Sequence, residues 1–394
     1  MYKILLLSPC DIFPPVDGNS MNIYNIVKYL CRKNQLSVLL SPVFSQGGEV
    51  DIAHPNLEIS YVPPTWLDGL KYRSIFINPY YYSAAWKVAQ HFQPDLIQCQ
   101  VLYTTPAGGL LKKRLKKPLV LVQENVEYLK YKRFGASPIL LHLLRAFEAA
   151  ACRMADKIVA VSPVDKEFMV KIYGVPKEKI HVIQHCVDPE VFKYRPEGRQ
   201  IVRERHGISP SDYILTFVGK LDTIPNAVAV RYISERIYPA ILAEYPQTAF
   251  FIIGQNYAPL LHYQKERMVF IGFVSNRKDL SPNLIDYLSA SDIVIIPLDS
   301  GSGTRVKILE AVACSRPIVS TVIGAEGLSF QDGQDMLLSE AVDEKFIDLI
   351  LELMRDKSRR EELGQRARER IIEEYNWERE IERYEEVYQE IESR

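Results

Sequence analysis

The stretch DSGSGTRVKILEAVACSRPIVST, residues 299–321, places a loop, a helix and a strand in quick succession. The run SDIVIIPLD, which leads into it, is short and apolar and ends near a proline, which is typical of a buried strand. SGSGT then supplies backbone freedom and open N–H groups. Val306, Leu309 and Val312 follow at helical spacing, and PIVST after the Arg-Pro pair predicts the next strand.

A Gly loop that leads from a strand into a helix can bind an anion, because the free N–H groups and the helix dipole both point at incoming negative charge. Arg305 and Lys307 stand in the first turn of this helix, where the dipole disfavours cations. A negatively charged ligand therefore explains their position better than helix stability does. The alternative for a Ser/Gly loop of this kind is a plain turn.

The alternation of short apolar runs with helical patterns continues along the chain and predicts α/β domains with parallel sheets. Between residues 186 and 212 the pattern loosens into a polar, Pro-bearing connection, and then it restarts. The expected strands are KILLLS, LSVLLS, LEISYV, LIQCQ, PLVLVQ, KIVAVS and IHVIQH before this connection, and YILTFVG, TAFFIIG, MVFIGF, DIVIIPL, PIVST and DMLLS after it.

Length and composition agree with two folded domains. The 394 residues are too many for one ordinary core. The 48 basic and 49 acidic residues nearly balance, so nothing in the net charge of -1 indicates a nucleic-acid partner. The six cysteines are scattered among apolar neighbours, which predicts reduced thiols in a cytoplasmic protein. KILLLS fits a first strand better than a signal peptide, and no apolar run reaches 18 residues.

The segment LLKKRLKKP, residues 110–118, carries a cluster of cations that suits anionic lipid headgroups. Such contact would hold the protein peripherally at the inner face of a membrane. A solvated helix end explains the same charges equally well. The cations are Lys112, Lys113, Arg114, Lys116 and Lys117.

Several enzyme classes lack their signatures here. The chain has no GxGxxG after a first strand, no Walker A loop, no HExxH and no GxSxG elbow. The seven histidines are dispersed, and His185 is interpreted as a hinge or core residue. With no metal-binding acidic motif in view, we expect a metal-independent activity.

Several segments, taken in order, resemble the retaining glycosyltransferases of family 4, which have the GT-B fold. They are FVGKLDTIPNAVAVRYI, VFIGFVSN, residues 288–328 and DGQDMLL in the second half, and PDLIQCQ, QENVEYLKYKRF, ADKIVAVSPVDKEFM and IQHCVDPEVF in the first half. The resemblance implies two Rossmann-like doubly wound domains that face each other across a cleft. We expect the acceptor-side domain at residues 1–187, with part of 378–394 packing back on it, and the nucleotide-sugar domain at 188–377.

The resemblance also implies roles for individual residues in transfer from a UDP- or GDP-linked sugar to a glycan, lipid-linked or small-molecule acceptor, with no permanent cofactor. Glu310 matches the glutamate that binds the donor ribose. Lys220 matches a basic residue whose positive charge neutralises the leaving group, and Arg305 and Lys307 are expected to assist it. The other expected donor contacts are Gly219, Phe273, Val274, Ser302, Gly303 and Thr304, and the acceptor-side residues are Asn19, Glu124 and Asn125. Independently of the resemblance, Gly18 in the first loop, SPCDIFPPVDGNS, is expected to bring backbone close to a phosphate; a plain Pro-rich loop is the alternative.

Three positions depart from the family pattern. Ser302 stands where the family has the first of two glutamates, and Glu124 stands where a histidine is common. The family's second basic residue falls among Ile224, Pro225 and Asn226. These departures leave two alternatives open: a nucleotide-sugar epimerase, and a non-catalytic relative that binds a nucleotide or a sugar.

Overall fold

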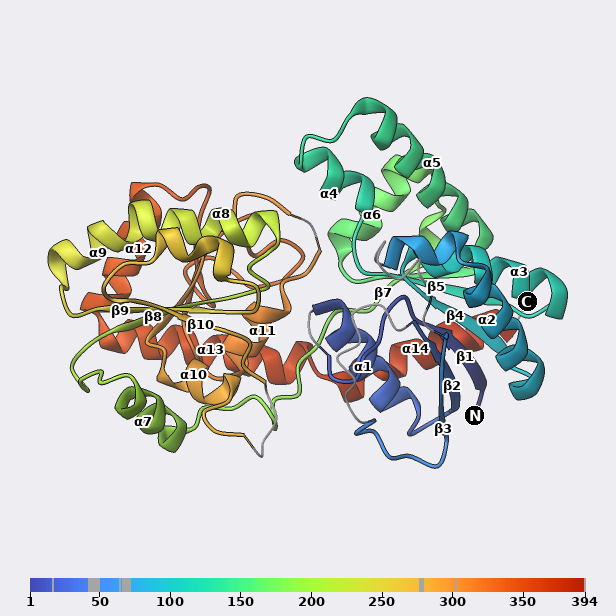
Figure 1. Ribbon diagram of the computed structural model, residues 1–394, viewed down its shortest axis with the longest axis horizontal. Coiled ribbons are helices and arrows are strands. Elements are labelled where there is room, and N and C mark those ends of the chain that lie inside the picture. Colours follow the sequence, from blue (N-terminus) through green and yellow to red (C-terminus); the bar gives the residue numbers. More distant parts are fainter. Residues whose placement is uncertain are drawn as a thin grey trace. The chain divides into compact units, whose positions relative to one another are not determined.

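A computed structural model describes residues 1–15, 18–41, 50–63, 65, 72–275, 280–301 and 303–392. The chain forms two compact units, each with its own sheet (Figure 1). Unit 1 comprises Met1–His185 and Trp377–Arg394, and unit 2 comprises Cys186–Asn376. All six cysteines are buried as thiols.

The described part of unit 1 contains a seven-stranded parallel sheet in the order β3-β2-β1-β4-β5-β6-β7. The chain first builds outward from β1 on one side and then returns to build on the other, so the strand order reverses between β1 and β4. This is a doubly wound sheet. Its strands are β1 (Lys3–Leu7), β2 (Gln35–Leu40), β3 (Leu57–Tyr61), β4 (Leu96–Gln100), β5 (Leu119–Gln123), β6 (Lys157–Ala160) and β7 (Ile180–Val182).

Helices cover both faces of this sheet (Figure 1). One face carries α2 (Pro79–Phe92), α3 (Thr105–Leu115), α5 (Pro138–Met154) and α6 (Pro163–Tyr173), and α4 (Glu127–Arg133) packs on α5. The other face carries α1 (Gly18–Leu30) and α14 (Trp377–Glu392). Short helical turns are η2 (Tyr72–Ile77), η3 (Leu102–Thr104) and η4 (Lys177–Lys179).

Aromatic side chains attach α14, the last helix of the chain, to unit 1. Trp377 stacks on Tyr29 of α1 at 6.0 Å between ring centroids. The Tyr388 hydroxyl donates a 2.6 Å hydrogen bond to Gln98 Oε1 in β4. All three aromatic residues of α14, Trp377, Tyr384 and Tyr388, are almost fully buried, so this helix is part of the core of unit 1.

The described part of unit 2 contains a six-stranded parallel sheet in the order β10-β9-β8-β11-β12-β13. The order reverses between β8 and β11, as in a dinucleotide-binding fold. Every expected strand of the sequence analysis overlaps an observed strand in one of the two sheets. The strands of this second sheet are β8 (Ile214–Val218), β9 (Ala249–Ile253), β10 (Met268–Ile271), β11 (Ile293–Ile296), β12 (Ile318–Thr321) and β13 (Leu337–Ser339).

The helices of unit 2 again form two layers (Figure 1). One layer contains α8 (Ile224–Tyr232), α9 (Tyr238–Glu244) and α12 (Glu344–Arg355), with the short η6 (Ala258–Tyr263) beside α8. The other contains α7 (Pro196–Arg205), α10 (Leu284–Ala290), α11 (Val306–Ala313) and α13 (Lys357–Glu374). Helices α7 and α10 pack closely because Gly198 has no side chain; a Cβ there would lie 2.3 Å from Asp286 Oδ1.

The helices predicted from the sequence differ from those of the structure at two places in unit 2. The pattern of residues 225–245 suggests one helix, but a π-helical turn at Ile233–Ile237 separates α8 from α9. Pro239 lacks an N–H to continue a regular helix, which favours such a break. The polar connection at residues 186–212 is also not all loop, because it contains α7. The low hydropathy of α7 hid it, since only one narrow stripe of that helix is buried.

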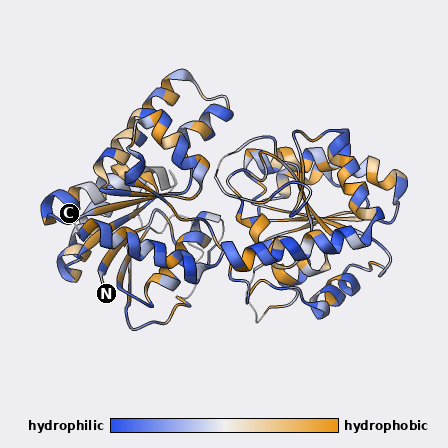
Figure 2. Ribbon diagram, turned by 180° about the vertical axis from the view of Figure 1, so that it is seen from behind, coloured by the Kyte–Doolittle hydropathy of each residue, from blue (hydrophilic) through white to orange (hydrophobic). Residues whose placement is uncertain are grey.

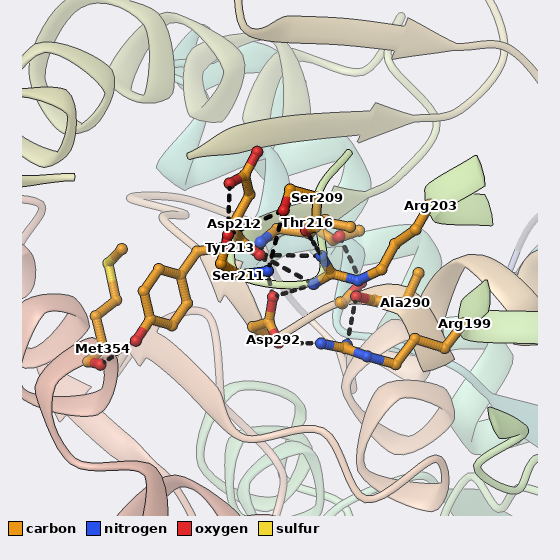
Figure 3. Close-up of polar contacts among 12 residues, drawn as sticks. Arg199, Arg203, Ser209, Ser211, Asp212, Tyr213, Thr216, Ala290, Asp292 and Met354 are labelled. Atoms are coloured by element: carbon orange, nitrogen blue, oxygen red, sulfur yellow. Dashed lines mark hydrogen bonds and ion pairs between the residues drawn. The ribbon is translucent and has the colours of Figure 1, made fainter. Parts of the chain in front are cut away.

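An ionic cluster fixes the amino-terminal edge of the unit 2 sheet (Figure 3). The Asp292 carboxylate, directly before β11, accepts from Arg199 at 2.8 Å, from Arg203 at 2.9 Å and from the Ile214 N–H of β8 at 2.8 Å. Arg203 also donates to the Asp212 carbonyl at 3.0 Å. The cluster therefore ties α7 to the first residues of the two central strands.

Candidate functional site

The loops singled out by the sequence meet at the point where the strand order of the unit 2 sheet reverses. β8 runs directly into Gly219 and Lys220, and the neighbouring strand β11 runs into the loop that ends at Arg305. Ligands of doubly wound sheets bind outside the carboxyl ends of the strands at this position. The sheet topology thus brings two stretches about 80 residues apart in sequence to one candidate site.

The Arg305 guanidinium lies against two glycines of the loop before α11, Gly301 and Gly303. Gly301 has φ 119° and Gly303 has φ 77°, both in the region that favours glycine. Arg305 Nη1 donates a 2.8 Å hydrogen bond to the Gly303 carbonyl. The φ of Gly301 strains any other residue there, and a Cβ would in addition lie 2.5 Å from Arg305 Nη2. Arg305 therefore holds the shape of the loop, and Ser302 lies outside the described residues.

The Lys307 ammonium lies beneath the end of β8. Its Nζ donates to Asn226 Oδ1 at 2.9 Å and lies 4.5 Å from the centre of the Phe217 ring. Asn226 Nδ2 in turn donates to the Lys220 carbonyl at 2.9 Å. A Cβ on Gly219 would come within 2.8 Å of this ammonium, so the absence of a side chain there leaves room for it. One asparagine thus couples α11 to the turn after β8.

Glu310 follows Lys307 by one helical turn on α11, and both groups have shifted pKa values. Burial and, to a smaller extent, the positive charge of Arg305 lower the pKa of Lys307 to about 7, while Glu310 opposes the shift. Burial raises the pKa of Glu310 to about 7, with Lys307 opposing. Both side chains are half-buried by exposed area, and an acid and a base whose pKa values are both shifted toward 7 are typical of a functional site.

The other predicted donor contacts of unit 2 lie at the carboxyl edge of the same sheet. Lys220 is half-buried and follows Gly219. Thr304 Oγ1 is buried and has no hydrogen-bond partner among the described residues. Phe273, 48% exposed, and the half-buried Val274 follow β10 at the same edge of the sheet. Within the described parts of the chain, no three His, Cys, Asp or Glu side chains are grouped so as to hold a metal ion.

Gly18, Asn19, Glu124 and Asn125 lie in unit 1, at the carboxyl edge of its sheet. Gly18 and Asn19 begin α1, and Asn22 in the same helix donates a 2.8 Å hydrogen bond to Glu124 Oε1. The half-buried Asn125 follows β5 directly after Glu124. The first turns of α1 and the end of β5 therefore form one polar group.

Sequence reasoning missed a residue of this polar group, His185. Its Nε2 lies 3.4 Å from Glu124 Oε2, and the residue is 4% exposed. Neither ring nitrogen has hydrogen-bond geometry to a partner in the described part of the chain. His185 is buried and is the last residue of unit 1 before the chain enters unit 2, in agreement with the hinge or core interpretation. Its contact with Glu124 was not expected, and its place just beyond the end of β7 is the signal that could have found it.

Gln100 is a second residue that the sequence did not single out. It is fully buried, yet neither its Oε1 nor its Nε2 has a hydrogen-bond partner among the described residues. Gln100 pairs with Val122 across β4 and β5, so its side chain shares a sheet face with that of Glu124 two residues further on. Buried amides without partners are rare, and a polar ligand or water at this edge would satisfy them.

The basic segment at residues 110–118 makes several contacts within unit 1. Lys112 pairs with Asp156 at 2.7 Å, Lys117 lies 3.9 Å from Asp95, and the Arg114 guanidinium lies 5.5 Å from the centre of the Trp86 ring. Lys113 and Lys116 are exposed. The segment thus presents less positive charge than its sequence suggests. No helix in the described ranges is long and apolar enough to cross a membrane.

Comparisons with known proteins agree with this geometry. The pattern of the family described as Glycosyltransferase Family 4 matches residues 16–191, and that of Glycosyl transferases group 1 matches residues 212–356. The D-inositol 3-phosphate glycosyltransferase of Xylanimonas cellulosilytica is 22% identical over 92% of this chain and 89% of its own length. The N-acetyl-alpha-D-glucosaminyl L-malate synthase of Bacillus anthracis is 24% identical over 77% of each chain.

Solved structures show the same fold. The sucrose-phosphate synthase of Thermosynechococcus elongatus superposes with a TM-score of 0.82 at 17% identity, covering 99% of both chains. Anabaena HepE, crystallised with UDP and glucose, superposes with a TM-score of 0.75 at 18% identity, covering 99% of this chain and 100% of its own. With both halves of the chain matched in sequence and the whole chain matched in fold, the protein belongs to glycosyltransferase family 4 and is a glycosyltransferase with the GT-B fold.

Proposed function

We propose that this enzyme transfers a sugar from a nucleoside-diphosphate sugar to a hydroxyl-bearing acceptor, with retention of the anomeric configuration and without a metal ion. The observation that carries the proposal is the Lys307–Glu310 pair on α11, next to the Gly loop and the turn after β8. Such a pair suits a ligand that combines a diphosphate with ribose hydroxyls. The complex of HepE with UDP-glucose supports UDP-linked sugars as the first donors to test.

The donor would use the loop and α11 together. The N–H groups of Gly303 and Thr304, next to the start of α11, would donate to the diphosphate. Glu310 would accept hydrogen bonds from the ribose hydroxyls, which suits a carboxylate that has few partners of its own. The exposed Phe273 and neighbouring Val274 would lie against the base.

Transfer requires stabilisation of the leaving group. As the bond between the sugar and the β-phosphate breaks, negative charge grows on the phosphate oxygen. Lys220, Lys307 and the loop N–H groups would face that charge, and one well-placed donor in a comparable site contributes roughly 3–4 kcal/mol. The family's second basic residue falls among Ile224, Pro225 and Asn226, and Asn226 holds Lys307 by a 2.9 Å hydrogen bond. Lys307 is then the replacement cation.

The acceptor would bind at the polar group of unit 1. The unsatisfied amide of Gln100 and ring nitrogens of His185 suit a ligand with several hydroxyls. Glu124 would accept from one of these hydroxyls while Asn22 and His185 hold its carboxylate. Curated relatives carry names that refer to D-inositol 3-phosphate and to L-malate, so a glycan, a lipid-linked sugar and a small hydroxylated molecule all remain in the proposal.

The test is a transfer assay on purified enzyme with UDP- and GDP-linked hexoses and N-acetylhexosamines, in the presence and absence of EDTA. Release of the nucleoside diphosphate and the anomeric configuration of the product are followed by NMR. We expect a retained configuration, activity that persists in EDTA, and strong loss in Lys220→Ala. An inverted product would contradict the retaining mechanism, and loss of activity in EDTA restored by a divalent cation would contradict metal independence.

A further inference from the structure

Helix α4 and the first half of α5 form a projection from unit 1 with an apolar surface (Figure 1). Ile139, Leu140 and Leu143, in the first two turns of α5, are 76%, 41% and 60% exposed. Only the second half of α5 is anchored in the unit, through the buried Glu148, Ala151 and Cys152. Figure 2 shows hydrophobic and hydrophilic residues intermixed along the ribbon of this projection.

The apolar surface continues along α5 to a second group of side chains. The Phe147 ring, one helical turn before Ala151, lies 5.6 Å from the Phe76 ring. Phe76 is 41% exposed, and its neighbours Ile77 and Tyr80 are exposed as well. A contiguous exposed apolar patch of this kind marks an interaction surface in a soluble domain.

The charges of the projection all have one sign. Residues 128–147 contain no Asp or Glu, whereas the flanking Glu127 and Glu148 are buried. Lys130 is half-buried and pairs with Glu127 at 3.1 Å. The exposed polar and charged side chains along the stretch include Lys132, Arg133, His142 and Arg145.

The projection has a fixed shape. The Glu148 carboxylate accepts the first N–H groups of α4, from Glu127 at 2.9 Å and Tyr128 at 2.8 Å, and also bonds the Tyr173 hydroxyl. Ser137 caps α5 by accepting from the Leu140 N–H at 3.4 Å. These bonds hold α4 and α5 in place, so the exposed leucines and isoleucine lie on an ordered helix.

We propose that this α4–α5 surface docks the enzyme on an anionic phospholipid bilayer. Apolar side chains with cations along the same stretch fit such a bilayer. The apolar side chains enter the headgroup region, and the cations attract its negative charge. A second copy of the chain fits less well, because a two-fold contact would bring the same cations face to face. The surface, rather than the basic segment at residues 110–118, is then the membrane contact.

Docking here would also place the acceptor site near the bilayer. Helix α4 begins two residues after Asn125, so the surface is continuous in sequence with the acceptor-side residues. A lipid-linked acceptor could then be taken from the membrane. This last step rests on the proposed acceptor role of Glu124, whereas the docking surface does not.

The test is sedimentation of the full chain with vesicles of phosphatidylcholine, with and without phosphatidylglycerol. Ile139→Glu/Leu143→Glu lowers the net charge by two and removes the apolar tip. The matched control Lys113→Ala/Lys116→Ala lowers the net charge equally on the basic segment. Ile139→Ser/Leu143→Ser removes the apolar groups without a change in charge. The four substituted side chains, Ile139, Leu143, Lys113 and Lys116, are all exposed. Circular dichroism checks that each variant folds.

We expect binding only to vesicles with phosphatidylglycerol, weakened by added salt. Both tip variants should reduce the partition coefficient at least about tenfold, since they remove two inserted side chains. The control should reduce it by less than about fivefold in total, the loss expected for one cation near the surface, because Lys113 and Lys116 are not part of the α4–α5 surface. No binding to anionic vesicles, or a larger loss in the lysine variant than in the tip variants, would overturn the proposal. Dimerisation that the tip variants abolish, without vesicle binding, would assign the surface to a second copy.

Discussion

Asn226 Oδ1 accepts a 2.9 Å hydrogen bond from Lys307 Nζ, and this bond fixes the ammonium beneath the turn after β8. Asn226→Ala removes the bond and also the 2.9 Å bond to the Lys220 carbonyl. We expect kcat to fall by about 10- to 100-fold, because a misplaced cation stabilises the leaving group less well. The matched control is Asn256→Gly, which removes an exposed 3.0 Å bond to Asp222 in the same unit and fits the φ of 62° at that position. Equal kcat values for the two variants would contradict this role of Asn226.

Donor binding should depend on the protonation of Lys307. Its pKa is about 7 in the free enzyme, so the amine loses its charge as the pH rises above 7. A bound diphosphate favours the charged form, which raises the pKa and draws in a proton. The affinity for the nucleoside diphosphate should therefore fall roughly tenfold or more between pH 7 and about pH 9, measured by titration calorimetry. Lys307→Arg stays charged and should lose most of this fall in affinity. The same slope in both proteins would assign the effect elsewhere.

Glu310 should lower the stability of the ligand-free enzyme at neutral and alkaline pH. Its pKa is raised from 4.5 to about 7 in the folded state, so the folded protein holds the proton more tightly than the unfolded chain. The stability from this group is fully present below about pH 4.5 and is lost as the pH rises to about 7. Glu310→Gln should then be more stable than wild type at pH 8, by on the order of 1–2 kcal/mol. Urea unfolding at several pH values tests this, and a less stable Gln variant at pH 8 would refute it.

The ionic cluster at the opposite edge of the unit 2 sheet should matter for stability. Asp292→Ala leaves Arg199 and Arg203 without their shared carboxylate, and the Arg203 residue is only 6% exposed. Breaking a buried pair in this way costs about 3–5 kcal/mol. The control Glu244→Ala removes the partner of Arg355, where both side chains are exposed, and should cost less than about 1 kcal/mol. Comparable losses in urea unfolding would show that the cluster is not a main support of the sheet.

The sheets could be read from the sequence, because buried parallel strands such as KILLLS and DIVIIPL are short continuous apolar runs between polar segments. The helices were harder. In residues 225–245 the apolar pattern runs on through Pro239, and nothing in it marks the π-helical turn. The α7 helix is polar because it covers the edge of unit 2 through arginines that bind carbonyls and Asp292 rather than through apolar side chains.

The site was predictable where local sequence carries the chemistry. The loop before α11, Lys307 and Glu310 lie within a dozen residues, so their association is a property of one strand–loop–helix unit. Asn226 and His185 were not recognised, because each acts through a partner some 60 to 80 residues away in sequence. Such pairs become visible only when the strand order places the two loops at neighbouring positions on one edge.

The most direct test of the account is calorimetric titration of wild type, Glu310→Ala and Glu124→Ala with UDP, GDP and ADP at pH 7. The account predicts that wild type binds one nucleoside diphosphate, that Glu310→Ala binds it at least tenfold more weakly through loss of the ribose hydrogen bonds, and that Glu124→Ala binds it as wild type does. Unchanged affinity in Glu310→Ala, or binding of no nucleoside diphosphate by wild type, would contradict the placement of the donor on α11 and its loop.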